Sequence, residues 1–390
     1  GLAAAKPSDG KAAMPKESWL AGLCRWCLTP IKRGTAVEKY RVSSHAGPAL
    51  SDCELWEGGE EPESNAQIDP AQCSFKASQL IGSGSFARVH LVEESSSGRQ
   101  FAVKVISKQE MIRAKQVDHV RAMRVNSEAL RHPFLVKFIR AQQTSRALHL
   151  VMELAEKGDI FSALRSRRKF SEDMSRFYSA QIVCALSYMH DAQHMVHRNI
   201  KPEACLLDGQ GFCKLASFMF TKHVEPGSRT YTLLGTPEYI APEILLNKGH
   251  SFPVDWWALG VLTYEFLVGQ PPFCDEDPMG IYQKILAGRL YYPKFVSALA
   301  KDLINLFCRA DLSKRLGAEG PSQVTSHIFF KLDWQQLLHR KVPQKCEALN
   351  PDELSPPDDT SAQSELPSTV SRSCDVFAAD WGPYVSEDIP

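Results

Sequence analysis

The chain has 390 residues, of which 45 are basic and 45 acidic, so its formal net charge is zero. This balance predicts no nucleic-acid partner and no strong electrostatic attraction to acidic membranes. Hydrophobic residues make up 44% of the chain, which suits a packed core, and the length allows one large or two ordinary domains.

The cysteine pattern and the absence of targeting signals bear on the compartment. The 11 cysteines are odd in number and scattered, which argues for a reducing compartment rather than a disulfide framework. No run approaches the ~20 apolar residues of a membrane span, and no charged start leads into a signal-peptide core. These features predict a soluble, cytoplasmic protein, with a nuclear or membrane-surface pool left open.

Residues 1–74 are predicted to form an N-terminal extension. Ser18–Lys32 carries apolar residues at the spacing of one helical face, which predicts an amphipathic helix. These residues are Trp19, Leu20, Leu23, Trp26 and Cys27. The acidic stretch Glu57–Glu63 is typical of a linker. The helix could dock on the folded part of its own chain, which we favour, or associate peripherally with a membrane through palmitoylated Cys24 and Cys27.

The central region, residues 75–330, opens with two glycines between strand-like runs. Because Gly82 and Gly84 have no side chain, backbone N–H groups there could approach phosphate oxygens closely. A pair of glycines alone fits an ordinary hairpin turn equally well. A strand-like run, Phe101–Lys104, then places one lysine fifteen residues after Val89. A glycine loop followed by such a lysine favours a nucleotide-binding hairpin.

Four motifs later in this region are far more specific. They stand in the order and at the spacing of a catalytic loop, an Asp-Phe-Gly position, an activation-segment anchor and a central helix. The motifs are His197–Glu203, Ser217–Met219, Gly235–Glu243 and Val254–Gly260. With Arg176–Ile182 and Thr232–Tyr239, they identify residues 75–330 as a protein kinase domain that resembles the catalytic subunit of cAMP-dependent protein kinase, in the AGC group.

The resemblance implies an α+β, bilobal protein-kinase fold, with a small β-rich lobe, a larger helical lobe and ATP between them. Residues 331–390 correspond to the C-terminal tail of the group and are expected to be partly disordered. Within this tail, Trp381 and Tyr384 have the spacing of an aromatic pair that relatives tuck into a pocket of the small lobe.

Most positions that contact the nucleotide in the family are retained. They are Ile81, Gly82, Gly84, Val89, Ala102, Lys104, Met152, Glu153, Leu154 and Leu206. The resemblance therefore implies that ATP binds weakly, without help from metal. The alternative is that these side chains only fill the core.

The charges that move a phosphoryl group are largely replaced. By resemblance, Met123 occupies the position of the glutamate that pairs with Lys104, and Glu128 could substitute only after a register shift of the helix. The catalytic aspartate is replaced by Asn199, whose amide cannot accept a hydroxyl proton, whereas Lys201 is retained.

The two magnesium-ligand positions hold Ala204 and Ser217. Magnesium prefers hard oxygen ligands, usually carboxylates, so we expect little magnesium binding. The sequence thus predicts a pseudokinase whose enzymatic activity is absent or strongly impaired. The competing interpretation is an active Ser/Thr kinase with atypical metal handling, in which Lys104, Lys201 and Asn199 carry a slow transfer of the ATP γ-phosphate to residues near basic side chains.

Regulatory and peptide-binding positions persist. Thr232 occupies a position that is phosphorylated in the family, and the matching phosphate-binding residues are Arg198, His119 and Lys222. Acids that receive arginines of a substrate correspond to Asp159, Glu203 and Glu265, and the apolar pocket corresponds to Leu233, Pro237 and Ile240. These residues predict binding of a basic peptide or pseudosubstrate, or of a cyclic-nucleotide-binding regulatory subunit. The alternative is that they are ordinary exposed acids.

Two further pairs are expected to be scaffold. By resemblance, Glu243 should form a structural ion pair with Arg315, and Asp255 should support the backbone of the catalytic loop. Neither implies chemistry.

Overall fold

The computed structural model describes residues 75–84, 86–341 and 375–385. All of them belong to one compact unit of the chain, residues 47–390. The predicted N-terminal helix, the acidic linker and the peripheral membrane association lie outside the described residues. Among the helices in the described ranges, none is both long and apolar enough to cross a membrane.

The small lobe is built on one antiparallel sheet with the order β1-β2-β3-β5-β4. Its strands are β1 (Phe75–Ser83), β2 (Ala87–Glu94), β3 (Gln100–Ser107), β4 (Phe138–Gln143) and β5 (Ala147–Glu153). Two helices, α2 (Lys108–Arg113) and α3 (Val117–Ala129), follow β3. Ser107 begins α2 by accepting a hydrogen bond from the backbone N–H of Glu110, as an N-cap serine does.

Side-chain alternation along β3 gives the sheet two apolar faces. Val103 and Val105 belong to a cluster on one face, whereas Ile106 belongs to a second cluster that includes Met123 of α3. The second face therefore packs against α3, and Lys104 shares that side of the strand with Ile106.

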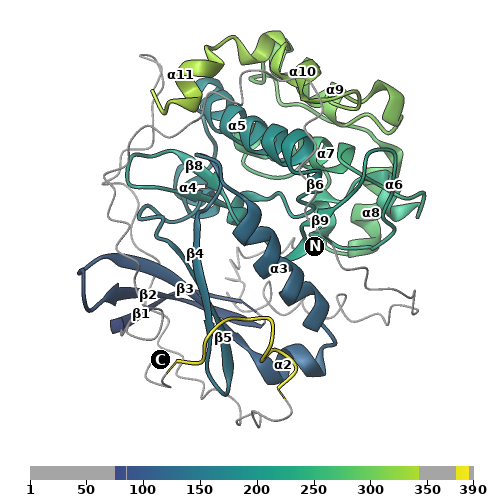
Figure 1. Ribbon diagram of the computed structural model, residues 1–390. Helices are drawn as coiled ribbons and strands as arrows, with labels where there is room; N and C mark the ends of the chain where they lie inside the picture. Colours follow the sequence, from purple (N-terminus) through teal and green to yellow (C-terminus); the bar gives the residue numbers. More distant parts are fainter. Residues whose placement is uncertain (1–74, 85, 342–374, 386–390) are drawn as a thin grey trace, which may run out of the picture. The chain divides into compact units, whose positions relative to one another are not determined.

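The larger lobe is helical. Its helices are α4 (Ile160–Arg167), α5 (Glu172–Ser187), α6 (Pro242–Leu245), α7 (Pro253–Val268), α8 (Pro278–Ala287), α9 (Ala298–Phe307), α10 (Pro321–Thr325) and α11 (Trp334–Leu338). Helix α7 is apolar nearly all round and is almost wholly buried between α5 and α9, as expected for a central core helix. Figure 1 shows α3 between the sheet and these helices.

Short strands and single turns complete the larger lobe. They are β6 (Met195–Val196), β7 (Cys205–Leu207), β8 (Cys213–Leu215) and β9 (Lys222–His223), with the single turns η2 (Pro202–Ala204), η3 (Phe218–Phe220) and η4 (Pro237–Tyr239). β7 pairs with β8, and β6 pairs with β9. The predicted α+β, bilobal kinase fold is thus confirmed.

Both scaffold predictions are also confirmed. Arg315 donates from two guanidinium nitrogens to the two carboxylate oxygens of Glu243, at 2.6 and 2.9 Å, and both side chains are buried. The carboxylate of Asp255 accepts hydrogen bonds from the backbone N–H groups of His197 and Arg198, at 2.8 Å each. The two hydrogen bonds to Asp255 fix the catalytic loop on α7.

The described part of the tail, residues 375–385, docks on the small lobe beside α2 and β4 (Figure 1). Trp381 and Phe377 are fully buried in the cluster that contains Met123. Tyr384 is partly buried and lies over the ammonium of Lys108, at 4.8 Å from the ring centroid. The tail aromatic pair predicted from spacing therefore contacts the small lobe, but Phe377 rather than Tyr384 is the second fully buried ring.

Candidate functional site

The glycine hairpin joins β1 to β2. The backbone N–H of Gly84 donates to the carbonyl of Ala87 at 2.8 Å, which closes the turn, and Gly82 pairs with Val89 across the ladder. Val89 in turn pairs with Lys104 of β3. Gly82, Val89 and Lys104 are therefore in register on three neighbouring strands of the sheet.

Lys104 has no acidic partner among the described residues. Its side chain is partly buried, and burial, with no opposing charge, lowers the pKa of its ammonium. Met123, at the expected partner position, is buried in apolar surroundings. Glu128 pairs instead with Arg124 at 3.4 Å on the exposed side of α3, so the register-shift alternative for Glu128 is wrong.

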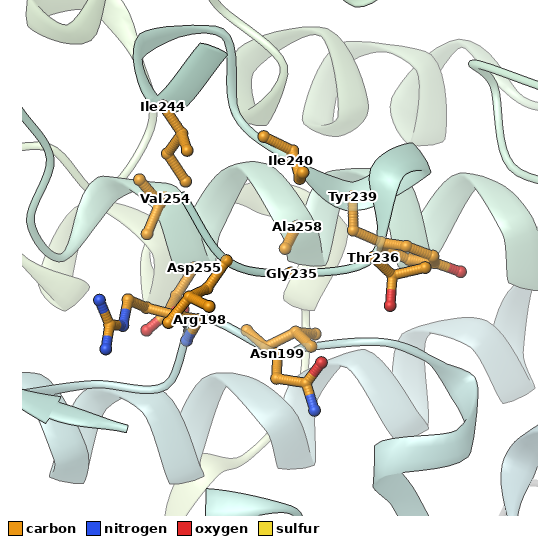
Figure 2. A pocket seen from close by; sticks show the side chains of 12 residues that line it. Arg198, Asn199, Gly235, Thr236, Tyr239, Ile240, Ile244, Val254, Asp255 and Ala258 are labelled. Carbon is orange, nitrogen blue, oxygen red and sulfur yellow. Dashed lines mark hydrogen bonds between the residues drawn. The ribbon is translucent and has the colours of Figure 1, made fainter. Parts of the chain in front are cut away.

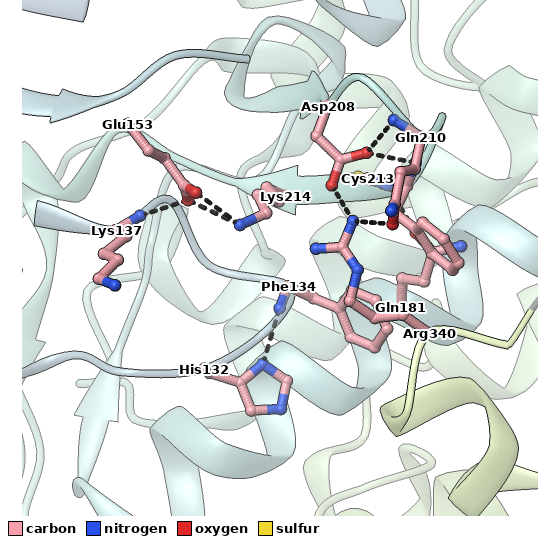
Figure 3. A network of polar contacts seen from close by, with 11 residues as sticks. His132, Phe134, Lys137, Glu153, Gln181, Asp208, Gln210, Cys213, Lys214 and Arg340 are labelled. Carbon is pink, nitrogen blue, oxygen red and sulfur yellow. Dashed lines mark hydrogen bonds and ion pairs between the residues drawn. The ribbon is translucent and has the colours of Figure 1, made fainter. Parts of the chain in front are cut away.

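The strand that leads into the hinge carries a polar link between the lobes. Both carboxylate oxygens of Glu153 accept from the ammonium of Lys214 on β8, at 2.8 Å, and one also accepts from the backbone N–H of Lys137 at 2.6 Å (Figure 3). Met152 pairs with Ala102 on β3, and Leu154 and Leu206 are partly buried. Sequence reasoning placed Glu153 at the hinge but missed Lys214.

A second part of this network holds the β7–β8 turn. Asp208 accepts from the backbone N–H groups of Gln210 and Phe212 at 3.0 Å each and forms an ion pair with Arg340 (Figure 3). The side-chain oxygen of Gln181 accepts from the backbone N–H of Cys213 at 2.6 Å. This turn is thereby held by α5 and by the segment that follows α11.

Asp255 stays ionised despite complete burial. Burial opposes its charge, but the hydrogen bond from His190 at 2.8 Å, the nearby His197 and the backbone of Arg198 outweigh it, so its pKa lies below the usual value. Figure 2 shows Arg198, Asn199 and Asp255 among the residues that line a pocket, together with Thr236 and Tyr239. The catalytic loop and the activation-segment anchor thus line the same pocket.

Three of the replaced positions come together at the end of the catalytic loop. The amide nitrogen of Asn199 donates to the hydroxyl oxygen of Ser217 at 3.0 Å. The backbone N–H of Ala216 donates to the carbonyl of Ala204 at 2.8 Å, which brings the third position alongside. Ser217 has a positive φ of 71°. The side chains at these three positions are all uncharged, and Lys201 begins the turn that ends at Ala204.

The predicted phosphate-binding residues form a basic cluster. The ammonium of Lys222 donates to the hydroxyl of Thr230 at 2.9 Å, and Arg198 donates from Nε to the carbonyl of Phe220 at 2.7 Å. Burial, only partly opposed by Asp255, lowers the pKa of Arg198 to about 10, and its Nη1 is buried without a hydrogen-bond partner.

Two histidines complete this cluster. Burial, and next the charge of Arg198, lower the pKa of His119, whose Nδ1 lies 2.6 Å from the side-chain oxygen of Gln116. His250 was missed by sequence reasoning because no kinase motif marks it. Burial and then Arg198 lower its pKa to about 4, and its Nε2 is buried without a partner. The backbones of His250 and Thr230 exchange two hydrogen bonds, whereas Thr232 is partly exposed.

The three acids that the resemblance assigns to peptide binding differ in their surroundings. Asp159 caps α4 by accepting from the backbone N–H of Ser162 at 2.7 Å, and Glu203 is exposed. Burial, with the charges of Glu203 and Glu238, raises the pKa of Glu265 to about 7, against the opposing hydrogen bond from Tyr239. The structure therefore brings Glu203 and Glu265 within electrostatic range of each other.

The three residues of the predicted apolar pocket do not share one environment. Leu233 is exposed and Pro237 is partly exposed. Ile240 is buried and lines the pocket of Figure 2, behind the surface. Only Leu233 and Pro237 are thus accessible to a partner.

Comparison with known proteins gives one family. The family model described as "Protein kinase domain" matches residues 75–330. The chain is 43% identical over 271 residues to the human cAMP-dependent protein kinase catalytic subunit PRKX, covering 69% of this chain and 75% of that protein. It is also 43% identical over 270 residues to the Dictyostelium discoideum cAMP-dependent protein kinase catalytic subunit, covering 68% of this chain and 41% of that protein.

A third relative is the human protein named "Putative serine/threonine-protein kinase PRKY", 46% identical over 235 residues, which cover 60% of this chain and 84% of that protein. The matched stretch is therefore less than half of the Dictyostelium relative but most of each human one. The two-lobed fold, the retained lysine of β3 and the family match agree, and the chain belongs to the protein kinase family.

Proposed function

We propose that this protein is a pseudokinase of the cAMP-dependent type, a kinase-fold regulator that binds basic peptides or a regulatory partner and transfers phosphate slowly or not at all. The observation that carries this proposal is the hydrogen bond from Asn199 to Ser217, beside Ala204. These three neutral side chains stand where phosphoryl transfer needs a base and metal-binding carboxylates.

The residues present do not suit magnesium. Magnesium takes near-octahedral oxygen coordination, usually with one or two carboxylates. Here the polar side chains are one amide and one hydroxyl, already hydrogen-bonded to each other, and Ala204 offers no ligand. We therefore derive no catalytic step through a metal at this site.

Partner binding rests on the intact larger lobe. Glu203 and Glu265 supply negative charge, and Leu233 is an exposed apolar residue, features that suit an arginine-containing segment with an apolar residue. Regulation by phosphorylation of Thr232 is part of the proposal, since Arg198, with a buried unpartnered nitrogen, and Lys222 belong to the nearby basic cluster.

An active Ser/Thr kinase is the second candidate function. It is favoured by the retained Lys104 and Lys201 and by relatives that are named as kinase catalytic subunits. The amide of Asn199 can still orient a hydroxyl, although loss of general-base help costs about 10²–10⁴ in rate.

A phosphotransfer assay on an Arg-Arg-x-Ser peptide separates the two. The wild-type chain, with magnesium or manganese, should stay at the background rate. The triple variant Asn199→Asp, Ala204→Asn, Ser217→Asp should gain metal-dependent transfer, because it restores the charges. The proposal fails if the wild-type rate equals or exceeds that of the triple variant and is abolished by Lys104→Met, whereas a trace rate far below that of the triple variant agrees with it.

A further inference from the structure

A cavity of about 510 Å³ lies at one end of the small-lobe sheet. The turn from β2 to β3, the segment that enters β4 and the hinge line it, and its side chains include Arg99, Phe101, Lys137 and Ile139. Because side chains alternate along β3, Phe101 lies on the face of the sheet opposite to Lys104. The strand wall of this cavity is therefore separate from the face that carries the predicted nucleotide lysine.

The described chain begins beside this cavity. Phe75, the first residue of β1, pairs with Glu94 at the end of β2, and Phe101 at the start of β3 pairs with Glu153 at the end of β5. The start of β1 thus lies at the same end of the sheet as the cavity. Phe75 and Ile139 also pack against the cluster that contains Phe101. The residues before Phe75 therefore leave the sheet next to the cavity wall.

The cavity combines an apolar wall with a cation. The guanidinium of Arg99 lies 5.5 Å from the centroid of the Phe101 ring, and Arg99 is exposed. Among the described residues, no acid forms an ion pair with it. A carboxylate beside an apolar side chain can contact both the guanidinium and the ring face.

The acids that border the cavity leave this charge unbalanced. Both carboxylate oxygens of Glu153 accept from the ammonium of Lys214 at 2.8 Å (Figure 3). The carboxylate of Glu156 lies against Gly209, on the turn between β7 and β8 of the larger lobe. The small-lobe side of the cavity therefore favours a negatively charged occupant, whereas its larger-lobe side does not.

We propose that the acidic segment of this same chain, residues 52–69, docks in this cavity, with a carboxylate on Arg99 and Ile68 against the ring of Phe101. The segment holds seven acidic residues and no lysine, arginine or histidine, so its charge complements that of Arg99. Asp69 stands six residues before Phe75, and six extended residues reach about 20 Å, which lets the acid return to the cavity. The inference goes beyond the proposed function and holds whether or not the chain transfers phosphate.

The acidic tail, residues 342–374, is the competing occupant. It leaves the larger lobe after Arg340, which forms an ion pair with Asp208 on the turn between β7 and β8. Glu156 lies against the same turn, at Gly209. Acids of the tail would meet like charge there, whereas residues 52–69 approach from the side of Arg99. The charges therefore favour the segment before β1.

Limited proteolysis of the full chain with a glutamate-specific protease tests the docking. Cleavage at the glutamates of residues 57–63 should be several-fold faster in Arg99→Glu than in the wild-type chain, because the reversed charge repels the segment. Salt at about 0.5 M should speed this cleavage in the wild-type chain more than in Arg99→Glu, since it screens the attraction. Arg99→Glu with Asp69→Lys should recover part of the protection.

A matched control and a conservative variant make the test specific. Arg113→Glu makes the same charge change at an exposed residue of α2, beyond the far end of β3, and should leave the cleavage rate unchanged. Arg99→Lys keeps the charge and supplies an amine that a carbodiimide can join to a nearby carboxylate. Mass spectrometry should then find position 99 cross-linked to an acid of residues 52–69 within one chain.

The possible outcomes identify the occupant. Equal cleavage rates in the wild-type chain and Arg99→Glu would overturn the docking. Cross-links from position 99 only to residues 342–374 would assign the cavity to the tail, and cross-links only between two chains would assign it to a second copy; either result also overturns the proposal. None of these readouts depends on phosphate transfer, so the docking and the proposed function can fail separately.

Discussion

Glu265 shows how neighbouring acids set the charge of a single residue. Burial, together with Glu203 and Glu238, raises its pKa to about 7, although the hydrogen bond from Tyr239 opposes the shift. At pH 6 most of the carboxyl is therefore neutral, and at pH 8 most of it is charged. Because the folded state binds this proton more tightly than the unfolded chain does, the free energy of unfolding falls as pH rises from about 4.5 to about 7.

Binding of a basic peptide should therefore depend on pH. An Arg-Arg-x-Ser peptide should bind several-fold more tightly at pH 8 than at pH 6, since a charged carboxylate forms a stronger hydrogen bond with arginine. Glu265→Gln should remove this dependence and hold the affinity near the pH 6 value. Fluorescence anisotropy across this pH range measures the effect.

The control for this titration is Glu93→Gln, which changes an exposed acid of the small lobe. It should keep the wild-type pH profile. Equal peptide affinity at pH 6 and pH 8 in the wild-type chain would show that Glu265 does not take part in binding.

At the scale of elements, the tail segment 375–385 helps to hold α3 against the sheet. In a helix with a glutamate at position 123, an ion pair with Lys104 would contribute to this. Arg121 forms an ion pair with Asp380 at 3.0 Å, so the tail holds α3 from its outer side. Lys108 forms a buried ion pair with Asp375 and donates to Gln143 at 2.8 Å. Trp381 inserts into the cluster that contains Met123, so apolar packing positions the helix where an ion pair to Lys104 is lacking.

Loss of the tail anchor should destabilise the small lobe. Trp381→Ala deletes a fully buried ring, and truncation of a buried tryptophan costs about 3–5 kcal/mol. Val376→Ala, in the same segment but 46% exposed, should cost less than about 0.5 kcal/mol. Urea unfolding followed by small-lobe hydrogen exchange measures both. Equal stability of the two variants would mean that the segment is not docked in solution.

At the scale of the whole molecule, motif spacing predicted the fold because the scaffold contacts lie inside the motifs themselves. Asp255 and Glu243 belong to the motifs defined above, and so does His197, whose backbone Asp255 binds. Arg315, the partner of Glu243, lies outside the motifs but was expected from the family resemblance. The same blocks located Asn199 and Ser217, but the hydrogen bond between their side chains was found only in the structure.

Contacts between residues that carry no motif could not be predicted. Lys214 and Glu153 are 61 residues apart in the sequence, and Lys108 and Asp375 are 267 apart. His250 is an isolated histidine whose importance lies in its burial beside Arg198. Lys214, Lys108, Asp375 and His250 look like ordinary surface residues in the sequence, and only the folded chain shows their partners.

The link between Glu153 and Lys214 joins the two lobes at the hinge and should limit their relative motion. Lys214 is nearly buried, and both oxygens of Glu153 accept from it, a geometry that is worth more than an exposed ion pair. Lys214→Ala should therefore loosen the hinge. Backbone hydrogen exchange in β5 and β8 should become several-fold faster, whereas exchange in the rest of the larger lobe should change little.

Two further variants separate a hinge effect from a general loss of stability. Lys294→Ala, which changes an exposed lysine, should leave hydrogen exchange in β5 unchanged. The double variant Glu153→Lys with Lys214→Glu should recover part of the protection against hydrogen exchange, because it restores the ion pair with the charges reversed. If Lys214→Ala leaves exchange in β5 and β8 at the wild-type rate, the backbone contacts of the hinge hold the lobes without the ion pair. A change confined to these strands, and recovered by the reversed pair, would instead make this link a determinant of how far the two lobes can separate.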